Sequence, residues 1–189
     1  MWQKRKRPTD EIERNVRDPE RARERTMNRA VKLLAAKPRS VRELRERLLE
    51  KSWTNAEIVD AVIEKLSDYK YLDDEQYAAG LALSKLRQRP QGKRRLRQSL
   101  SQKKLDKETI DKAIASAFEK LPETDLIDRE IEKRIRLKGV PQTRDEIKKF
   151  YDHLVRRGFG YDLVSTKLRE ISKFDPDQNV PHEIEKAAQ

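Results

Sequence analysis

The sequence predicts an all-α protein made of three tandem three-helix repeats that form an elongated, curved body. Apolar residues recur in one fixed spacing at three places along the chain, and the steps within that spacing are typical of helices. Of the 189 residues, 35% are hydrophobic and 42% are charged. This balance suits several small helical cores better than one thick core.

The repeated spacing places apolar residues at offsets of 0, 4, 9, 14 and 18 from Leu44, again from Leu96, and again from Phe150. Steps of four on either side of a break put two residues on a face of one helix and two on a face of the next. The remaining residue lies in the connector between these helices, and we expect all five to be core. The connector residues are Trp53, Leu105 and Phe159; the other members are Leu48, Ile58, Val62, Leu100, Ile110, Ile114, Leu154, Val164 and Leu168.

A further helix is predicted before each of these pairs, over residues 21–37, 74–89 and 126–137. The register of the third differs from the other two because the connector that follows it is longer. The apolar stripes are Met27, Val31 and Leu34; then Ala79, Leu83 and Leu86, 52 residues later; then Ile127, Ile131 and Ile135.

One proline marks the connector before the second helix of each repeat. Pro38, Pro90 and Pro141 stand shortly before the second helix of each repeat, where a connector accepts proline and a helix interior does not. The predicted organisation is a charged tail at 1–20, repeats at 21–72, 73–124 and 125–174, and a polar tail at 175–189.

Four polar residues stand where helix N-caps are needed: Ser40, Thr54, Asp73 and Thr143. Capping also explains the acidic run Asp73, Asp74 and Glu75. A metal site at these carboxylates is the weaker interpretation, because no further ligands accompany them.

The residues available for catalysis are few. His153 and His182 lie near no plausible nucleophile or metal cluster in the sequence, and both are expected to be solvated. The five glycines form no phosphate-binding loop. We therefore expect a non-enzyme without catalytic residues, cofactor or metal.

The absence of cysteine excludes disulfides and indicates a reducing compartment, so a cytoplasmic location is expected. No apolar run is long enough to span a membrane, and the first residues lack the apolar stretch of a signal peptide. We expect no membrane partner, and we expect a monomer.

The net charge is +11, which favours an anionic partner. The segment between Leu81 and Leu105 contains no acidic residue, and its cations are predicted to form a surface that binds phosphate or an acidic protein groove. A merely solvated helix face is the alternative. The predicted partner-binding residues are Lys85, Arg87, Arg89, Lys93, Arg94, Arg95, Arg97, Lys103 and Lys104.

Two segments resemble the RecX family. YLDDEQYA at 71–78, followed by RQRPQGKRRLRQSL at 87–100, is similar to the central RecX signature, and AVKLLAAKPRSVRELRERLLEKSW at 30–53 resembles the first RecX repeat. The resemblance covers residues 21–173. The family usually has a glycine after the second helix of each repeat. Gly158 retains it, whereas Ser52 and Lys104 replace it, so altered or mildly strained turns are expected there.

This resemblance implies a modulator, mainly an inhibitor, that binds the RecA filament on single-stranded DNA, in its helical groove. It would restrain the ATPase, strand-exchange and coprotease activities of RecA in recombination, DNA repair and the SOS response. Direct contact with single-stranded DNA would be weak and independent of sequence. Two alternatives remain open: a helical-repeat protein that binds DNA or RNA without RecA, and a structural adaptor whose charge serves solubility.

Overall fold

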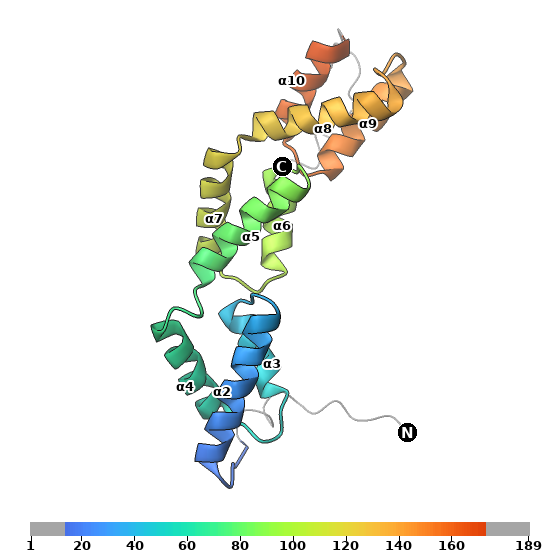
Figure 1. The fold of residues 1–189 in the computed structure, drawn as a ribbon. Helices are drawn as coiled ribbons and strands as arrows, with labels where there is room; N and C mark the ends of the chain where they lie inside the picture. Colours follow the sequence, from blue (N-terminus) through green and yellow to red (C-terminus); the bar gives the residue numbers. More distant parts are fainter. Residues whose placement is uncertain (1–13, 173–189) are drawn as a thin grey trace, which may run out of the picture. The chain divides into compact units, whose positions relative to one another are not determined.

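The computed structural model describes residues 14–172, and within this range it contains helices and no strand. Figure 1 shows the helices in chain order. Their bounds are α2 (Pro19–Ala36), α3 (Val41–Leu49), α4 (Ala56–Asp68), α5 (Asp74–Gln88), α6 (Lys93–Ser101), α7 (Lys107–Lys120), α8 (Glu123–Lys138), α9 (Arg144–Arg156) and α10 (Tyr161–Ser172). The all-α prediction is confirmed, and three helices lie in each stretch where a repeat is expected.

The described chain divides into two compact units. The first unit contains residues 14–80 and 100–110, and the second contains residues 81–99 and 111–172. The boundary passes through α5, α6 and α7, so these units do not coincide with the predicted repeats. The repeat bounds therefore stay a prediction.

In the first unit, α2, α3 and α4 pack against one another in pairs (Figure 1). Their shared core includes Ala30 from α2, Leu44 and Leu48 from α3, and Val59 and Val62 from α4, all at most 1% exposed. Burial of the leucine and valine side chains stabilises the fold by about 1.5–3 kcal/mol each. The small bundle therefore depends on a few aliphatic residues.

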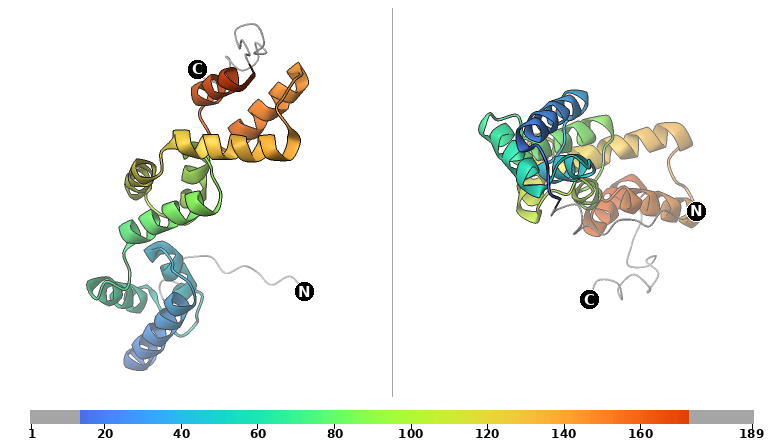
Figure 2. Two further views of the ribbon diagram at one scale, coloured as in Figure 1. Left: turned by 45° about the horizontal axis from the view of Figure 1, so that its top comes forward. Right: turned by 90° about the horizontal axis from the view of Figure 1, so that it is seen from below.

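In the second unit, α10 packs against both α8 and α9 (Figure 2). The fully buried residues include Ile127 from α8, Leu154 from α9, and Val164 and Leu168 from α10. Phe159, in the turn between α9 and α10, is 1% exposed. This connector aromatic thus fills the corner between two helices, as predicted.

Fourteen of the fifteen residues in the repeated spacing are buried, and Trp53 is the exception. Trp53 is only half-buried, so its assignment to the core was wrong. The guanidinium of Arg25 lies 4.3 Å from the centre of the indole ring and the Lys51 ammonium lies 5.8 Å from it. Cationic side chains therefore cover this corner, where a buried core residue was expected.

The buried face of α2 also differs from the prediction. Val31 is 51% exposed, whereas Thr26 and Ala30 are completely buried. In α5 the residues 52 positions later, Ala78 and Ala82, are buried in the same way. Small side chains allow a neighbouring helix to approach closely. The buried stripe of α2 therefore runs through Thr26 and Ala30, one position before the predicted Met27 and Val31.

Three of the four predicted N-caps are confirmed. Ser40 accepts from the Glu43 N–H, Asp73 accepts from the Gln76 N–H, and Thr143 forms a capping box at the start of α9. The fourth was wrong, because Asn55 caps α4. Thr54 is instead buried, with its hydroxyl 3.1 Å from that of Thr26.

Two equivalent contacts link consecutive predicted repeats. In the first unit, the Ser40 hydroxyl donates to the Lys103 carbonyl at 2.6 Å. In the second unit, the Gly92 N–H donates to the Arg157 carbonyl at 3.0 Å. Gly92 follows Ser40 by 52 residues and Arg157 follows Lys103 by 54, as the apolar spacing requires. We call these contacts the first joint (residues 40–46 with 103–104) and the second joint (92–98 with 156–158).

The second joint brings main chains together without intervening side chains. Gly158 has φ +89°, and a Cβ atom there would lie 2.4 Å from both the Cβ and the N of Arg95. A Cβ atom on Gly92 would lie 2.1 Å from the Gly158 carbonyl oxygen. In the first joint Lys104, at the position of Gly158, has φ 58°, so the expected strained turn occurs there. Ser52 has no positive φ, so the first repeat forms a different turn.

We predict that Gly158→Ala destabilises the protein more than Gly139→Ala does. Gly139 has φ +80° but open space around its Cα, so its substitution costs only the backbone strain of about 1–2 kcal/mol. At Gly158 the collision with Arg95 adds about 1–3 kcal/mol. Urea unfolding of both variants measures the difference; equal losses would mean that the second joint is not tightly packed.

We also predict that Phe159→Ala costs about 3–5 kcal/mol of unfolding free energy, as for a buried aromatic residue. Trp53→Ala should cost less than about 2 kcal/mol, because its side chain is only half-buried and part of its cover comes from the Arg25 and Lys51 side chains. Denaturant unfolding of the two variants compares them directly. A larger loss for Trp53 than for Phe159 would contradict the burial described above.

Candidate functional site

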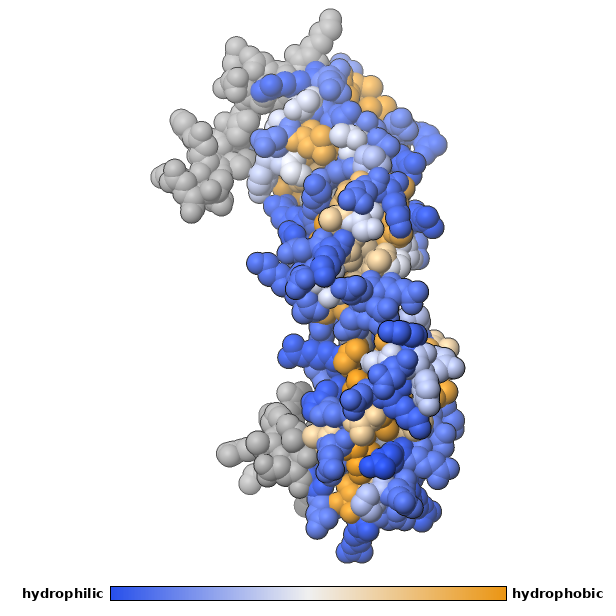
Figure 3. All heavy atoms as spheres, turned by 90° about the vertical axis from the view of Figure 1, so that its left-hand side faces the viewer, coloured by the Kyte–Doolittle hydropathy of each residue, from blue (hydrophilic) through white to orange (hydrophobic). Residues whose placement is uncertain are grey.

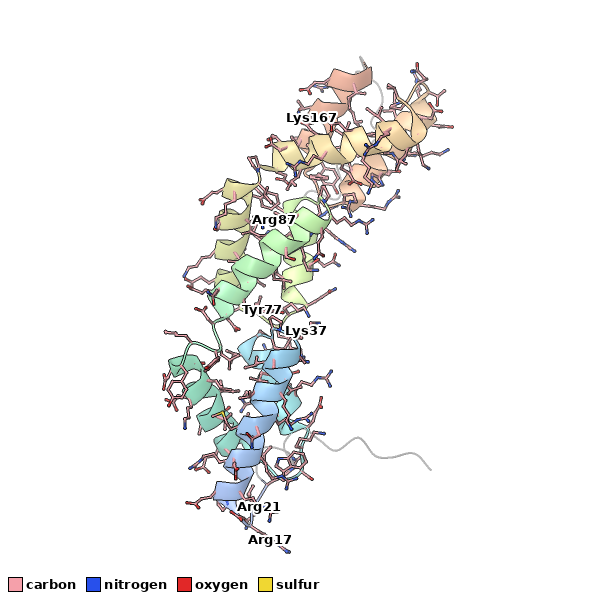
Figure 4. All side chains as sticks on the ribbon, in the orientation of Figure 1. Arg17, Arg21, Lys37, Tyr77, Arg87 and Lys167 are labelled. Atoms are coloured by element: carbon pink, nitrogen blue, oxygen red, sulfur yellow. The ribbon has the colours of Figure 1, made fainter. Side chains whose placement is uncertain are left out.

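The nine predicted partner-binding cations lie on two helices and their ends. Lys85 and Arg87 belong to α5 (Figure 4 labels Arg87), and Arg89 follows it. Lys93, Arg94, Arg95 and Arg97 belong to the first turns of α6, and Lys103 and Lys104 follow that helix. The first seven lie in the second unit, and the last two lie in the first unit. All are exposed except Lys85 and Lys103, which are half-buried.

Lys103 and Lys104 have acidic partners in the first joint. The Lys103 ammonium lies 3.3 Å from the Glu43 carboxylate, and Lys104 pairs with Glu46. These pairs connect α3 to the turn after α6. Both lysines therefore contribute to the packing between predicted repeats.

Three cations of α6 contact groups within the second unit. Arg97 forms an ion pair with Asp111 at 2.6 Å, and Lys93 lies 3.8 Å from Glu123. Arg94 donates to the Val155 carbonyl at 2.7 Å, and its guanidinium lies 5.6 Å from the centre of the Tyr161 ring. Exposed pairs of this kind contribute at most about 1 kcal/mol each, so these side chains can still exchange partners.

Four of the predicted cations have no carboxylate partner within residues 14–172: Lys85, Arg87, Arg89 and Arg95. Arg95 donates to the Gln98 side-chain oxygen at 3.0 Å, which leaves its charge unbalanced. All four lie in the second unit. The excess positive charge is therefore concentrated along the end of α5 and the start of α6.

Arg156 and Arg157, which the sequence analysis did not select, complete this basic region at the end of α9. Arg157 is 8% exposed; its Nε lies 3.4 Å from a Glu130 carboxylate oxygen, and it also donates to the Pro90 carbonyl. Arg156 is exposed. The 54-residue offset that relates Arg157 to Lys103 was the signal that could have identified them.

Burial and neighbouring cations both affect the pKa of Arg157 at the end of α9. Desolvation lowers the pKa of Arg157, Glu130 raises it, and the neighbouring charges of Arg89 and Arg95 lower it further. The cations of the second unit therefore lie close enough to repel one another. An anion bound among them would reduce this repulsion.

His153 does not have the solvated environment that was expected. Its side chain is 26% exposed, and its Nε2 lies 2.8 Å from the buried Glu130 carboxylate. Glu130 thus bridges His153 and Arg157 within the second unit. This is a structural network under the α9–α10 turn. His182 lies outside the described residues.

The acidic run at the start of α5 has structural partners. Asp73 caps the helix, and Asp74 accepts from the Val41 N–H at 2.9 Å in the first unit. Among residues 14–172, no three histidine or acidic side chains gather in a way that could hold a metal ion. No helix in that range combines the length and apolarity needed to cross a membrane.

Taken together, the helices and the cations define a basic helical-repeat protein. Its residues 27–66 match the sequence profile of the first three-helix domain of RecX, and residues 73–114 match that of the second. Regulatory protein RecX of Bacillus subtilis is 29% identical over 157 residues, which are 82% of this chain and 58% of that protein. The chain thus spans less than two thirds of that relative's length; for the Bacillus licheniformis protein the share is 59%.

Solved structures agree in fold. The crystal structure of RecX from Lactobacillus salivarius superposes with a TM-score of 0.71 at 21% identity, covering 80% of this chain and 97% of that one. A second crystal structure, of a regulatory protein RecX, has a TM-score of 0.68 at 22% identity and covers 80% of this chain and 73% of that one. The two domain profiles, the relatives named regulatory protein RecX and the two solved structures together support the RecX family for this chain.

We predict that the two neighbouring arginines at the end of α9 differ sharply in their effect on stability. Arg157→Gln should cost about 3–5 kcal/mol, because it leaves the buried Glu130 carboxylate without its guanidinium partner. Arg156→Gln should change stability by no more than about 0.5 kcal/mol. Thermal and urea unfolding test this; similar losses for both variants would remove Arg157 from a structural role.

Proposed function

We propose that this protein is a regulator of the RecA recombinase that binds the RecA filament on single-stranded DNA and restrains its activities. It acts by binding, as a monomer in the cytoplasm, and not by catalysis. The support is similarity to proteins that are called regulatory protein RecX, together with cations on the second unit that have no acidic partner within residues 14–172. Of these, the concentration of exposed cations on α5 and α6 carries the proposal for how the partner is bound.

The surface chemistry favours an anionic partner over an apolar one. On the face drawn in Figure 3, apolar side chains form small patches separated by hydrophilic residues. A large exposed apolar patch usually marks an interface that depends on hydrophobic burial. Charge complementarity is therefore the better candidate for recognition here, and it would act on association rate and specificity.

The protein would regulate RecA if it binds one state of the RecA filament more tightly than another. A ligand that touches more than one protomer binds best when the protomers have the spacing that it fits, so it shifts the filament toward that state. If this state is less active, ATP hydrolysis, strand exchange and coprotease activity decrease together. Binding in the filament groove would also exclude duplex DNA from the same space.

The direct test is the ATPase activity of RecA on single-stranded DNA, measured while this protein is added. We expect inhibition by the wild-type protein. The double variant Arg87→Glu and Arg89→Glu should inhibit about tenfold less well, equivalent to about 1.4 kcal/mol, because both side chains are exposed and lack acidic partners in the described chain.

A matched control is Arg23→Glu with Arg42→Glu, which changes the net charge equally on exposed positions of α2 and α3. This control should inhibit as the wild type does. Equal weakening by both double variants would assign the effect to overall charge and not to the α5–α6 region. No effect of the wild-type protein on RecA would contradict the proposed function itself.

The second candidate is a protein that binds nucleic acid without RecA, and the same unbalanced cations favour it. Its binding to single-stranded DNA would be strong without RecA and steeply dependent on salt. The effect on RecA separates the two candidates, because the second one predicts DNA binding with no change in the ATPase activity of RecA.

A further inference from the structure

The two equivalent joints differ in charge, because acidic and basic residues pair in the first joint and basic residues predominate in the second. In the first joint, Glu43 and Glu46 on α3 pair with Lys103 and Lys104 in the facing turn. The residues 52 positions after Glu43 and Glu46 are Arg95 and Gln98 on α6. The second joint thus keeps a hydrogen bond to the equivalent backbone carbonyl, that of Arg157, but has neither of the two carboxylates.

Basic residues remain on the other side of the second joint. Arg157 stands where Lys103 stands in the first joint, and Arg156 precedes it. An open hollow of about 290 Å³ lies here, lined by Arg94, Arg95, Gln98, Arg156 and Gly158. Three arginine residues therefore line it, and no acidic residue does.

Some guanidinium N–H groups of the residues that line this hollow have no hydrogen-bond acceptor within residues 14–172. Arg156 forms no ion pair or side-chain hydrogen bond within residues 14–172, and Arg95 donates only to Gln98. Arg94 is fixed beside the hollow by its bond to the Val155 carbonyl. Guanidinium groups match phosphate oxygens in geometry and can bind them through two parallel hydrogen bonds.

The backbone contact makes the arrangement rigid. The backbone N–H of Gly92 donates to the Arg157 carbonyl, and the backbone N–H of Arg94 donates to the Gly158 carbonyl at 3.3 Å. No side chain fits between the two segments at Gly92 and Gly158. The start of α6 and the end of α9 are therefore held together before any ligand arrives. Preorganised cations bind an anion with less loss of conformational freedom than mobile surface lysines do.

We propose that the second joint is a binding site for a phosphate group of a nucleic-acid backbone. The lining residues are polar or glycine, so there is no apolar anchor of the kind that protein interfaces depend on, and an acidic peptide is the less suitable occupant. No aromatic ring lines the hollow to stack a base, so contact is restricted to the backbone and is independent of sequence. This site requires no RecA and goes beyond the proposed function.

The test is the binding of a fluorescent oligothymidylate to the full-length protein, without RecA, over a range of salt concentrations. The variant Arg95→Glu with Gln98→Glu gives the second joint the carboxylates of the first, so it should fold. We expect its affinity to fall about tenfold or more and the slope of log K against log salt to decrease by about 0.7, the loss of one phosphate contact.

The matched control is Arg129→Glu with Gln76→Glu, two exposed positions outside the hollow that change the net charge by the same amount. Its salt slope should equal that of the wild type. The proposal is wrong if the two double variants show equal losses of affinity and equal decreases in the slope of log K against log salt. The hollow would then contribute only to the overall positive charge of the protein. Should the joint variant prove unfolded, Arg156→Gln, a substitution of one exposed side chain, replaces it with the same expected direction.

Amide chemical shifts identify the source of the phosphate. We expect oligothymidylate to shift the amide signals of Arg95, Gln98 and Gly158. Shifts at these residues with inorganic phosphate but none with the oligonucleotide would overturn the assignment to nucleic acid. Shifts with an acidic peptide but none with the oligonucleotide would overturn it as well, in favour of a protein ligand.

Discussion

The structure depends on one recurring contact: the turn that follows the second helix of one predicted repeat closes on the start of the second helix of the repeat before it. In the second unit this contact is between main chains, because Gly92 donates to Arg157 and Gly158 leaves no room for a side chain. In the first unit the Ser40 hydroxyl takes the role of the Gly92 N–H. Small three-helix cores gain order from their neighbours through such contacts.

The same contact has two different chemical consequences. Where glutamates face lysines, as at Glu43 and Lys103, the joint is neutral and has only a structural role. Where Arg95 faces the end of α9, positive charge accumulates and no carboxylate balances it. Tandem repeats allow this specialisation, because one copy can preserve the packing while another changes its surface. Charge at the second joint is therefore better explained by a ligand than by stability.

Much of the fold was predictable from the sequence, because helical periodicity and repeated spacing are local signals. The spacing from Leu44, Leu96 and Phe150 identified the core, apart from Trp53, whose ring is covered by cations that spacing cannot reveal. Asn55 replaced Thr54 as a cap because Thr54 pairs with the distant Thr26. The sequence analysis selected the cations of α5 and α6 but not Arg156 and Arg157. The 54-residue offset could have pointed to these two residues, whereas their closeness to Arg95 depends on tertiary packing.

Amide hydrogen exchange at the second joint tests the central claim most directly, because it reports whether the backbone contact persists in solution. The account predicts that the amides of Gly92 and Arg94, which donate to Arg157 and Gly158, are protected to the same degree as amides in the core of α9. Exchange of both amides at the rate of exposed loop residues would show that the joint is open. The basic hollow would then have no fixed form.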